Sequence, residues 1–372
     1  MFDRAGELFA ATEHTWPAAQ AFMAAEAQRV VRGEEKPGAL SRAGPYVERA
    51  ARNGLSLAPA FRQLIDLARA YNKGDLPKLR QLATLPNLQR RIIATVPMLT
   101  ASALAATALQ QRDEDELADL IDYLDRLRRT VPVARQLMTI ADAYARLLRA
   151  APVDSDAIRD AFVALAALGG VTGSGYHIGL VGRLLAHERS PGVHEIINSD
   201  AYQSQYNAPN AVNRAAILTV RATHAASIGD KRDAVSLWNE ALQVASRNGY
   251  HLHTTEALEA LAATVANPEQ CLLWTAAAQQ LRDQTMSAFR FQPEQIALDD
   301  AVHRSQQAQR HRTQPTSQQT SHALDPIRVA EQAIRTTRTA TSNDTHHRHA
   351  SAPTDDNQDP TPTPTPPRTP PA

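Results

Sequence analysis

Apolar residues recur at three- and four-residue spacing along most of the chain, from about residue 10 to about residue 300. This spacing places them on one face of an α-helix. In Asp115–Leu127 the acidic side chains fall on the opposite face, and the apolar positions are Leu117, Leu120, Ile121 and Leu124. Strand patterns are scarce, since aromatic residues make up only 5% of the chain and alternating β-branched runs are hard to find. The sequence therefore predicts an all-α protein.

Short groups of Gly, Pro, Asn and Asp interrupt the helical pattern at regular intervals, as expected at turns between helices. The turn positions in front of every second helix are Asp75, Asp113, Asp154, Gly192, Asp230 and Pro268. They are spaced by 38, 41, 38, 38 and 38 residues. An apolar residue stands four positions after each of them: Leu79, Leu117, Ile158, Ile196, Ala234 and Leu272. A fixed period of this length indicates stacked helical hairpins.

The period predicts an α-solenoid of about six helical hairpins over residues 1–302. One hairpin cannot bury its apolar face alone, so neighbours stack and form an extended concave surface. We expect Leu237, Trp238 and Leu242 to lie between adjacent hairpins. A non-repetitive helical bundle is the alternative fold.

Residues 303–372 differ in composition, being rich in Gln, Thr, Ser, His, Arg and Pro. Such a segment cannot bury enough apolar surface to offset chain entropy, so it is predicted to be a disordered spacer. Within it, Pro326–Ile334 is predicted to form a transient helix, and His346–His349 offers at most loose metal binding.

The charge and cysteine content exclude several classes of protein. Thirty-nine basic and 39 acidic residues give zero formal charge, which argues against a whole-protein attraction to nucleic acid or to anionic membranes. The longest apolar run, Ala161–Gly170, is too short to span a bilayer, and the first residues do not resemble a signal peptide. With Cys271 as the sole cysteine, neither an intramolecular disulfide nor a cysteine-based zinc cage can form. A cytoplasmic protein is expected.

The clearest copy of the repeat carries a resemblance to a known family. Gly229–Leu242 resembles the second helix of a tetratricopeptide repeat, with Ala234, Trp238 and Ala241 at the small, aromatic and small positions. Together with three later segments, Thr255–Ala263, Asn267–Cys271 and Ala276–Arg282, it is similar to the end of the repeat region in large bacterial LuxR-type ATP-dependent transcriptional regulators. The resemblance covers roughly residues 210–300. It implies partner binding in signalling or transcriptional regulation.

The chain departs from these regulators in lacking their two other modules. It contains no G-x-x-x-x-G-K-[ST] loop, and the nearest string, Gly170–His177, lacks the lysine that would reach a phosphate. No DNA-binding helix-turn-helix follows the repeats. We therefore predict a non-enzymatic scaffold that binds a protein or peptide. The alternative is an effector-sensing fragment of such a regulator that has lost its ATPase and DNA-binding modules.

Three motifs resemble ligand sites, and each has a simpler structural explanation. Gly169–Gly175 is a helix connector rather than an anion cradle. His194–Asn198 has Asn where a zinc-protease helix needs its second histidine, which favours a surface turn. Cys271 occupies a position that favours core packing over a catalytic thiol.

The histidine pair at the start of the last predicted hairpin is a fourth candidate. His251, His253 and Glu256 could meet a metal ion, but a two-residue spacing does not suit one helix face. The sequence favours a helix start with Thr254 or Thr255 as N-cap and with both histidines solvated.

The best binding candidate is a basic stripe. Arg214, Arg221 and His224 lie roughly on one helical face and could hold an acidic or phosphate-bearing ligand. An ordinary solvated stripe is the alternative. The acidic cluster from Asp113 to Asp122 needs only a structural explanation, because acidic side chains stabilise a helix start. No catalytic residue, cofactor or metal site is predicted.

Overall fold

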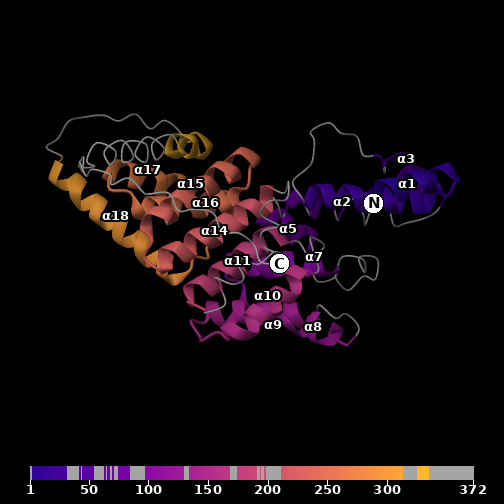
Figure 1. Cartoon of the computed structure of the whole chain (residues 1–372), viewed down its shortest axis with the longest axis horizontal. Coiled ribbons are helices and arrows are strands. Elements are labelled where there is room, and N and C mark those ends of the chain that lie inside the picture. Colours follow the sequence, from indigo (N-terminus) through magenta and orange to yellow (C-terminus); the bar gives the residue numbers. More distant parts are fainter. Residues whose placement is uncertain are drawn as a thin grey trace, which may run out of the picture. The chain divides into compact units, whose positions relative to one another are not determined.

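The computed structural model describes residues 2–31, 44–53, 74–83, 97–129, 134–167, 174–190, 211–312 and 325–334, with a few further positions at 42, 63, 65–67, 69–70, 193 and 197. All regular secondary structure in these residues is helical, which confirms the all-α prediction (Figure 1). None of their helices is both long and apolar enough to cross a lipid bilayer.

Where the residues between two helices are all described, the connection is short. In chain order they are α1 (Phe2–Ala11), α2 (Thr15–Val31), α3 (Gly44–Arg52), α5 (Leu76–Leu82), α7 (Pro97–Gln111), α8 (Glu114–Leu127), α9 (Ala134–Leu148), α10 (Ser155–Ala167), α11 (Ser174–His187), α14 (Ala211–Ser227), α15 (Lys231–Asn248), α16 (His251–Thr264), α17 (Pro268–Thr285) and α18 (Gln292–Arg312). Residues 326–334 form a further short helix.

Aspartates at the predicted turns start four of these helices. Each carboxylate accepts a hydrogen bond from the backbone N–H three residues later, at 3.0–3.2 Å: Asp75, Asp113, Asp154 and Asp230. Such capping satisfies a backbone donor that the first helical turn leaves without a partner. The apolar residues four positions on are buried, as predicted: Leu79, Leu117, Ile158 and Ala234. The turn position Gly192 and its Ile196 lie outside the described residues.

The last predicted turn is displaced by one residue. Asn267, not Pro268, caps α17, and its side-chain oxygen accepts from the backbone N–H groups of Glu269 and Gln270 at 2.9 and 3.4 Å. Pro268 takes the first helical position, where its missing N–H costs nothing. The buried residue four positions after the cap is therefore Cys271, which is 0% exposed, and Leu272 is only half-buried. The burial of Cys271 confirms its prediction as a core residue.

Helices that are consecutive in the chain also pack on one another. The pairs α7–α8, α8–α9 and α9–α10 are in contact, and so are the consecutive pairs from α14 to α18. Alternate helices also meet, in the pairs α7–α9, α14–α16 and α16–α18. These contacts bury the apolar faces of the helices against their neighbours.

Two large apolar clusters fill this arrangement. The larger cluster includes the inner faces of α7 to α11, and in α8 it takes Leu117, Leu120 and Leu124, as the amphipathic pattern predicts. The second cluster belongs to α14–α18 and contains Trp238 and Leu242. The two helix groups are drawn in purple to pink and in pink to orange in Figure 1.

The helical unit extends beyond residue 302. It runs from Met1 to Ile334, because α18 continues to Arg312 and the helix at 326–334 belongs to the same apolar cluster as α14–α18. That helix buries Val329, Ala330 and Ala333 in the same cluster as Leu298 and Ala301. The predicted boundary thus falls inside a helix, because composition alone does not register the good helix formers that continue α18. Residues 326–334 are helical, as predicted. Residues 303–312, which were predicted to be disordered, are helical because they continue α18, and apart from Asp325 the rest of the predicted tail lies outside the described residues.

Candidate binding pocket

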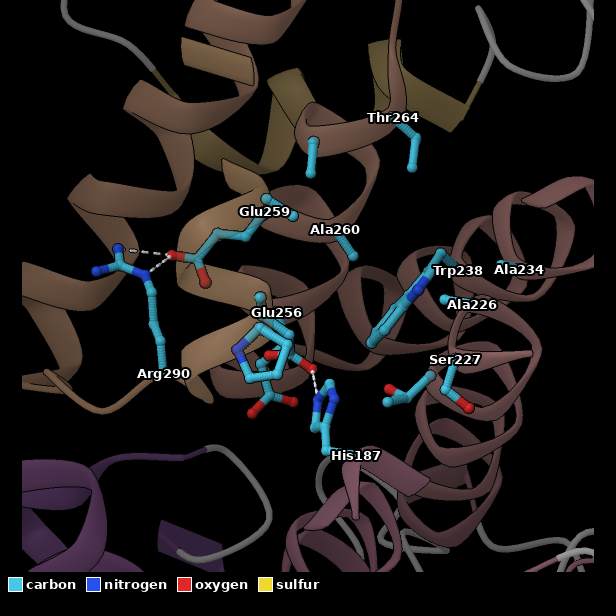
Figure 2. A pocket seen from close by; sticks show the side chains of 15 residues that line it. His187, Ala226, Ser227, Ala234, Trp238, Glu256, Glu259, Ala260, Thr264 and Arg290 are labelled. Atoms are coloured by element: carbon cyan, nitrogen blue, oxygen red, sulfur yellow. Dashed lines mark hydrogen bonds and ion pairs between the residues drawn. The ribbon is translucent and has the colours of Figure 1, made fainter. Parts of the chain in front are cut away.

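A cavity of about 260 Å³ opens among the C-terminal helices. Small and apolar side chains form most of its lining. The charged side chains and His187 lie together on one side, which we call the base of the pocket (Figure 2). The lining residues are His187 of α11, Thr223, Ala226 and Ser227 of α14, Ala234 and Trp238 of α15, Glu256, Glu259, Ala260, Ala263 and Thr264 of α16, Arg290, and Pro293, Glu294 and Ala297 of α18.

The start of α15 places one wall of the pocket. Asp230 caps the helix, and Ala234 and Trp238 then stand one and two turns further along the same face. Both side chains are buried, and Trp238 lies beside the cavity (Figure 2). The sequence predicts Trp238 as a residue between hairpins, and the structure adds that its ring also lines a cavity.

The connection between α17 and α18 places the opposite wall. Met286 ends α17 in the left-handed backbone region, with φ 55°. The carbonyl of Gln110 on α7 then accepts from the backbone N–H groups of Ala288 and Phe289 at 2.7 and 3.1 Å. These bonds hold the connection in place, so that Arg290 and the first turn of α18, with Glu294, face the cavity.

Arg183 of α11 links three helices at the base of the pocket. Its guanidinium pairs with Glu256 of α16 at 2.5 Å and with Glu294 of α18, although its side chain is only 4% exposed. It also lies 5.0 Å from the centre of the Phe291 ring and 5.9 Å from that of Trp238, within the range of cation–π attraction. Charge pairing and aromatic contact together stabilise the buried cation.

A histidine contacts each of the two carboxylates that pair with Arg183. Nε2 of His187 lies 2.8 Å from Oε1 of Glu294, and Nδ1 of His253 lies 3.4 Å from Oε2 of Glu256. Gly179 of α11 makes room for the second ring, since a Cβ at that position would lie 3.3 Å from Cε1 of His253.

The burial of His253 corrects the sequence analysis, which left both histidines of this segment solvated. His253 is 2% exposed, because Glu256 one turn later on α16 supplies a partner. The helix start was also wrong: the N-cap is Tyr250, which makes no side-chain cap bond. Thr254 and Thr255 lie inside the helix, and their hydroxyls donate one turn back, to the carbonyls of residues 250 and 251.

A second ionic cluster borders the first. Arg282 of α17 donates to both oxygens of Glu259 at 2.6 Å, in the fork geometry that favours arginine–carboxylate pairs. Arg290 donates to Oε1 of Glu259 from two nitrogens, at 2.8 and 3.0 Å. Arg282 also donates to the carbonyl of Phe289, at 3.0 Å, which joins this cluster to the connection before α18.

The neighbouring cationic and histidine side chains keep the carboxylates of Glu256 and Glu294 ionised. Burial by itself would raise the pKa of Glu256, but the Arg183 guanidinium and His253 outweigh it and lower that pKa. For Glu294, burial alone would again raise the pKa, but Arg183 and His187 lower it to about 2. The base of the pocket therefore holds fixed negative charges, each matched by a nearby arginine.

The predicted basic stripe lies on α14 but does not line this pocket. Arg214 is exposed and pairs with Glu240 of α15 at 2.5 Å, while Arg221 and His224 are half-buried. The residues that α14 contributes to the pocket are Thr223, Ala226 and Ser227. His224 instead borders an open hollow of about 760 Å³ beside Arg189 and Ile228. No residue of the stripe lines the pocket, but the hollow shares Ala226 and Ser227 with it, so the two candidate sites adjoin at the end of α14.

The other sequence motifs add no site. The acidic cluster has the predicted structural role: Asp113 caps α8 and pairs with Arg80 at 2.6 Å, and Glu114 pairs with Arg149 at 2.7 Å. Most of Gly169–Gly175 and of His194–Asn198 lies outside the described residues. In the part of the chain that the structure describes, no three His, Cys, Asp or Glu side chains gather as a metal site would require.

Sequence reasoning missed Arg183, Glu259, Arg290 and Glu294. One signal was available: α16 carries Glu256 and Glu259 one turn apart in an otherwise apolar stretch, and buried carboxylates need partners. The partners could not be read from the sequence, because Glu294 and Arg183 are 111 residues apart.

Comparisons with known proteins give no further guide. The chain matches no protein-family profile, no curated protein and no solved structure.

Proposed function

We propose that this protein is a non-enzymatic helical-repeat scaffold that binds a protein or peptide segment at the pocket between α14, α15, α16 and α18. In this proposal the helices form an α-solenoid of tetratricopeptide-like hairpins with a period near 38 residues, as the turn spacing predicts. The contacts between consecutive helices, and those of the alternate pairs α7–α9, α14–α16 and α16–α18, support a stack of this kind.

The observation that carries the proposal is the apolar lining of the pocket together with exposed apolar residues next to it in sequence. Ile228 follows the pocket residue Ser227, borders the adjoining hollow and is 68% exposed, and Ile296, 54% exposed, precedes the pocket residue Ala297. Exposed apolar side chains that gather near a cavity are typical of a surface that another chain covers. The cavity has room for one anchoring side chain of such a chain.

The charged base of the pocket supports binding rather than catalysis. A general base works best with a pKa near the operating pH. Glu294, with its pKa at about 2, and Glu256, with a lowered pKa, are both held by Arg183. Their pairing makes the pocket rigid, which reduces the ordering cost when a ligand binds.

A small effector is the second candidate ligand. Sensing of an effector by a LuxR-like repeat fragment would need an enclosed cavity, and about 260 Å³ is close to the lower end of the usual size for small-molecule sites. The exposed apolar residues next to the pocket favour a longer ligand. The resemblance of residues 210–300 to regulator repeats supports a role in bacterial signalling or transcriptional regulation.

The test compares full-length baits in capture from a lysate of the source cells, read by mass spectrometry. Ala297 lies exposed at the pocket mouth, so Ala297→Trp should block the pocket without disturbing the core. Gln306→Trp places the same ring at an exposed position of α18 away from the pocket. We expect a stoichiometric partner on the wild-type and Gln306→Trp baits that is lost with Ala297→Trp.

A fourth bait separates the pocket from the basic stripe. Replacing Arg214 and Arg221 with alanine should leave capture intact if the pocket is the site. A partner that survives Ala297→Trp but is lost from the double-alanine bait would move the site to the stripe. Equal capture by all baits would contradict both.

A further inference from the structure

The lining of the pocket is richer in hydrogen-bond acceptors than in donors. The carboxylates of Glu256, Glu259 and Glu294 all line the cavity, and ionised carboxylates can only accept. The two arginines that pair with them from behind, Arg183 and Arg282, are each 4% exposed and are not among the lining residues. A group that enters the cavity therefore meets Glu256 and Glu294 without Arg183, and it meets Glu259 beside Arg290, which also lines the cavity.

The remaining nitrogen-bearing groups at the base are already engaged with acceptors. Arg290 donates to Glu259, Gln279 and Gln295. His187 shares a hydrogen bond with Glu294. An anion would have to compete with these partners while lying close to three carboxylates. The nearest charges dominate in a partly buried site, because Coulomb energy falls with distance and rises in a low dielectric.

The walls next to the base suit the aliphatic part, or stem, of a long side chain. Ala226, Ala260, Ala263 and Ala297 leave open space, and Trp238 borders it with an aromatic ring (Figure 2). A straight side chain with a polar end can lie along such walls while its head reaches the base. The Trp238 ring also favours a positive head, as it already does for Arg183.

We propose that the pocket takes a lysine or arginine side chain of a bound peptide, with the stem against the alanine walls and Trp238 and the cationic head donating to the carboxylates at the base. This inference rests on the proposed function, since it names the chemistry of the anchoring side chain. It predicts partners whose binding segment carries a basic residue next to apolar ones, which would contact Ile228 and Ile296.

The test begins with a random peptide library displayed on phage and selected on the full chain, with bound clones retested on Ala297→Trp. Clones that bind wild type and not Ala297→Trp should carry a lysine or arginine with apolar neighbours. In a synthetic copy of the leading clone, the basic residue is then replaced by norleucine, which keeps the stem and removes the charge. We expect Kd, measured by fluorescence anisotropy, to rise about tenfold to a hundredfold, as for loss of a charged hydrogen bond.

A protein variant checks the same contact from the other side. Glu294→Gln should weaken the basic peptide and leave the norleucine peptide unchanged, while Glu269→Gln at an exposed site of α17 should affect neither. The peptide substitution leaves the protein untouched, so it stays decisive even if Glu294→Gln lowers stability. Pocket-dependent clones that bind equally well with norleucine would overturn the inference and leave the proposed function standing. If none of the selected clones depends on the pocket mouth, that result contradicts the proposed function itself.

Discussion

The α8–α9 and α16–α17 hairpins have the same type of element but use charge in opposite ways. In the first, charged side chains stay at the surface: Arg149 and Glu114 form an ion pair while 59% and 44% exposed. In the second, Arg282 and Glu259 pair at 4% and 10% exposure, and the neighbouring Arg183 is as deeply buried. The first hairpin is stabilised by apolar packing, and the second is stabilised by apolar packing and a buried ionic network.

The difference indicates what the network is for. Exposed ion pairs contribute about 0–1 kcal/mol. A buried pair must offset a large desolvation cost, and well-packed apolar residues of similar size often stabilise a core equally well. A hairpin that needed only stability could therefore use the all-apolar solution of α8–α9. The buried charges of α16–α17 lie where the pocket lies, which supports a role in holding its base in one geometry.

The largest expected effect comes from breaking the buried network. Arg183→Ala should lower the free energy of unfolding by about 3–5 kcal/mol, because it leaves Glu256 and Glu294 buried without their main partner. Arg149→Ala in the α8–α9 hairpin should cost less than about 1 kcal/mol. Guanidinium unfolding of both variants checks the contrast. Equal losses would contradict the distinction between the two hairpins.

Acid should weaken the C-terminal helices through the same groups. Glu294 has a folded-state pKa of about 2 against an ordinary value of 4.5, so its contribution is present above about pH 5 and is lost as pH falls towards 2. The lowered pKa of Glu256 acts in the same direction. For Glu294 the loss is on the order of 3 kcal/mol. Melting temperature measured from pH 7 to pH 2 should fall less steeply for Glu294→Gln than for wild type; parallel curves would refute this assignment.

The contrast also explains what the sequence could predict. In α8 the apolar and acidic residues separate cleanly, so Leu117, Leu120 and Leu124 could be assigned to the core and Asp113 to the helix start. The other aspartate turns were found in the same way, since capping depends on local sequence.

The pocket could not be predicted, because its residues come together only through long-range packing. In α16 nearly every residue is buried, Glu256 and Glu259 included, so no polar face marks the exposed side. Their partners come from α11, α17 and the connection before α18. For the basic stripe, the sequence placed Arg214 at the surface of α14, where the structure finds it. The sequence did not predict that Glu240 of the neighbouring helix pairs with it there.

Helix caps should behave alike in the two regions. Asp230→Ala at the start of α15 should cost about 1 kcal/mol, since it removes one capping bond of 3.0 Å. Asp113→Ala at α8 removes a similar bond and an exposed pair with Arg80, and should cost slightly more. Replacement by asparagine, which caps equally well, should restore most of both losses in thermal unfolding. No recovery with asparagine would mean that the charge, not the cap, is what matters.

The smallest effect is expected at the basic stripe. Arg214→Ala removes only an exposed pair with Glu240 and should change the unfolding free energy by less than about 1 kcal/mol. A double-mutant cycle with Glu240→Ala measures the coupling between the two residues. A coupling well above 1 kcal/mol would show that this surface pair is structurally important after all.

The most direct test of the account is whether a ligand enters the pocket beside Trp238. Tryptophan emission of the full chain is recorded while the leading pocket-selected peptide is added, and the titration is repeated with Trp238→Phe. Of the three tryptophans, Trp238 lines the cavity, while Trp274 lies in the core of α17. The account predicts a saturable change in emission with wild type that disappears with Trp238→Phe although the peptide still binds. Binding that leaves the wild-type emission unchanged, or changes it equally in Trp238→Phe, would place the ligand elsewhere and contradict the central claim.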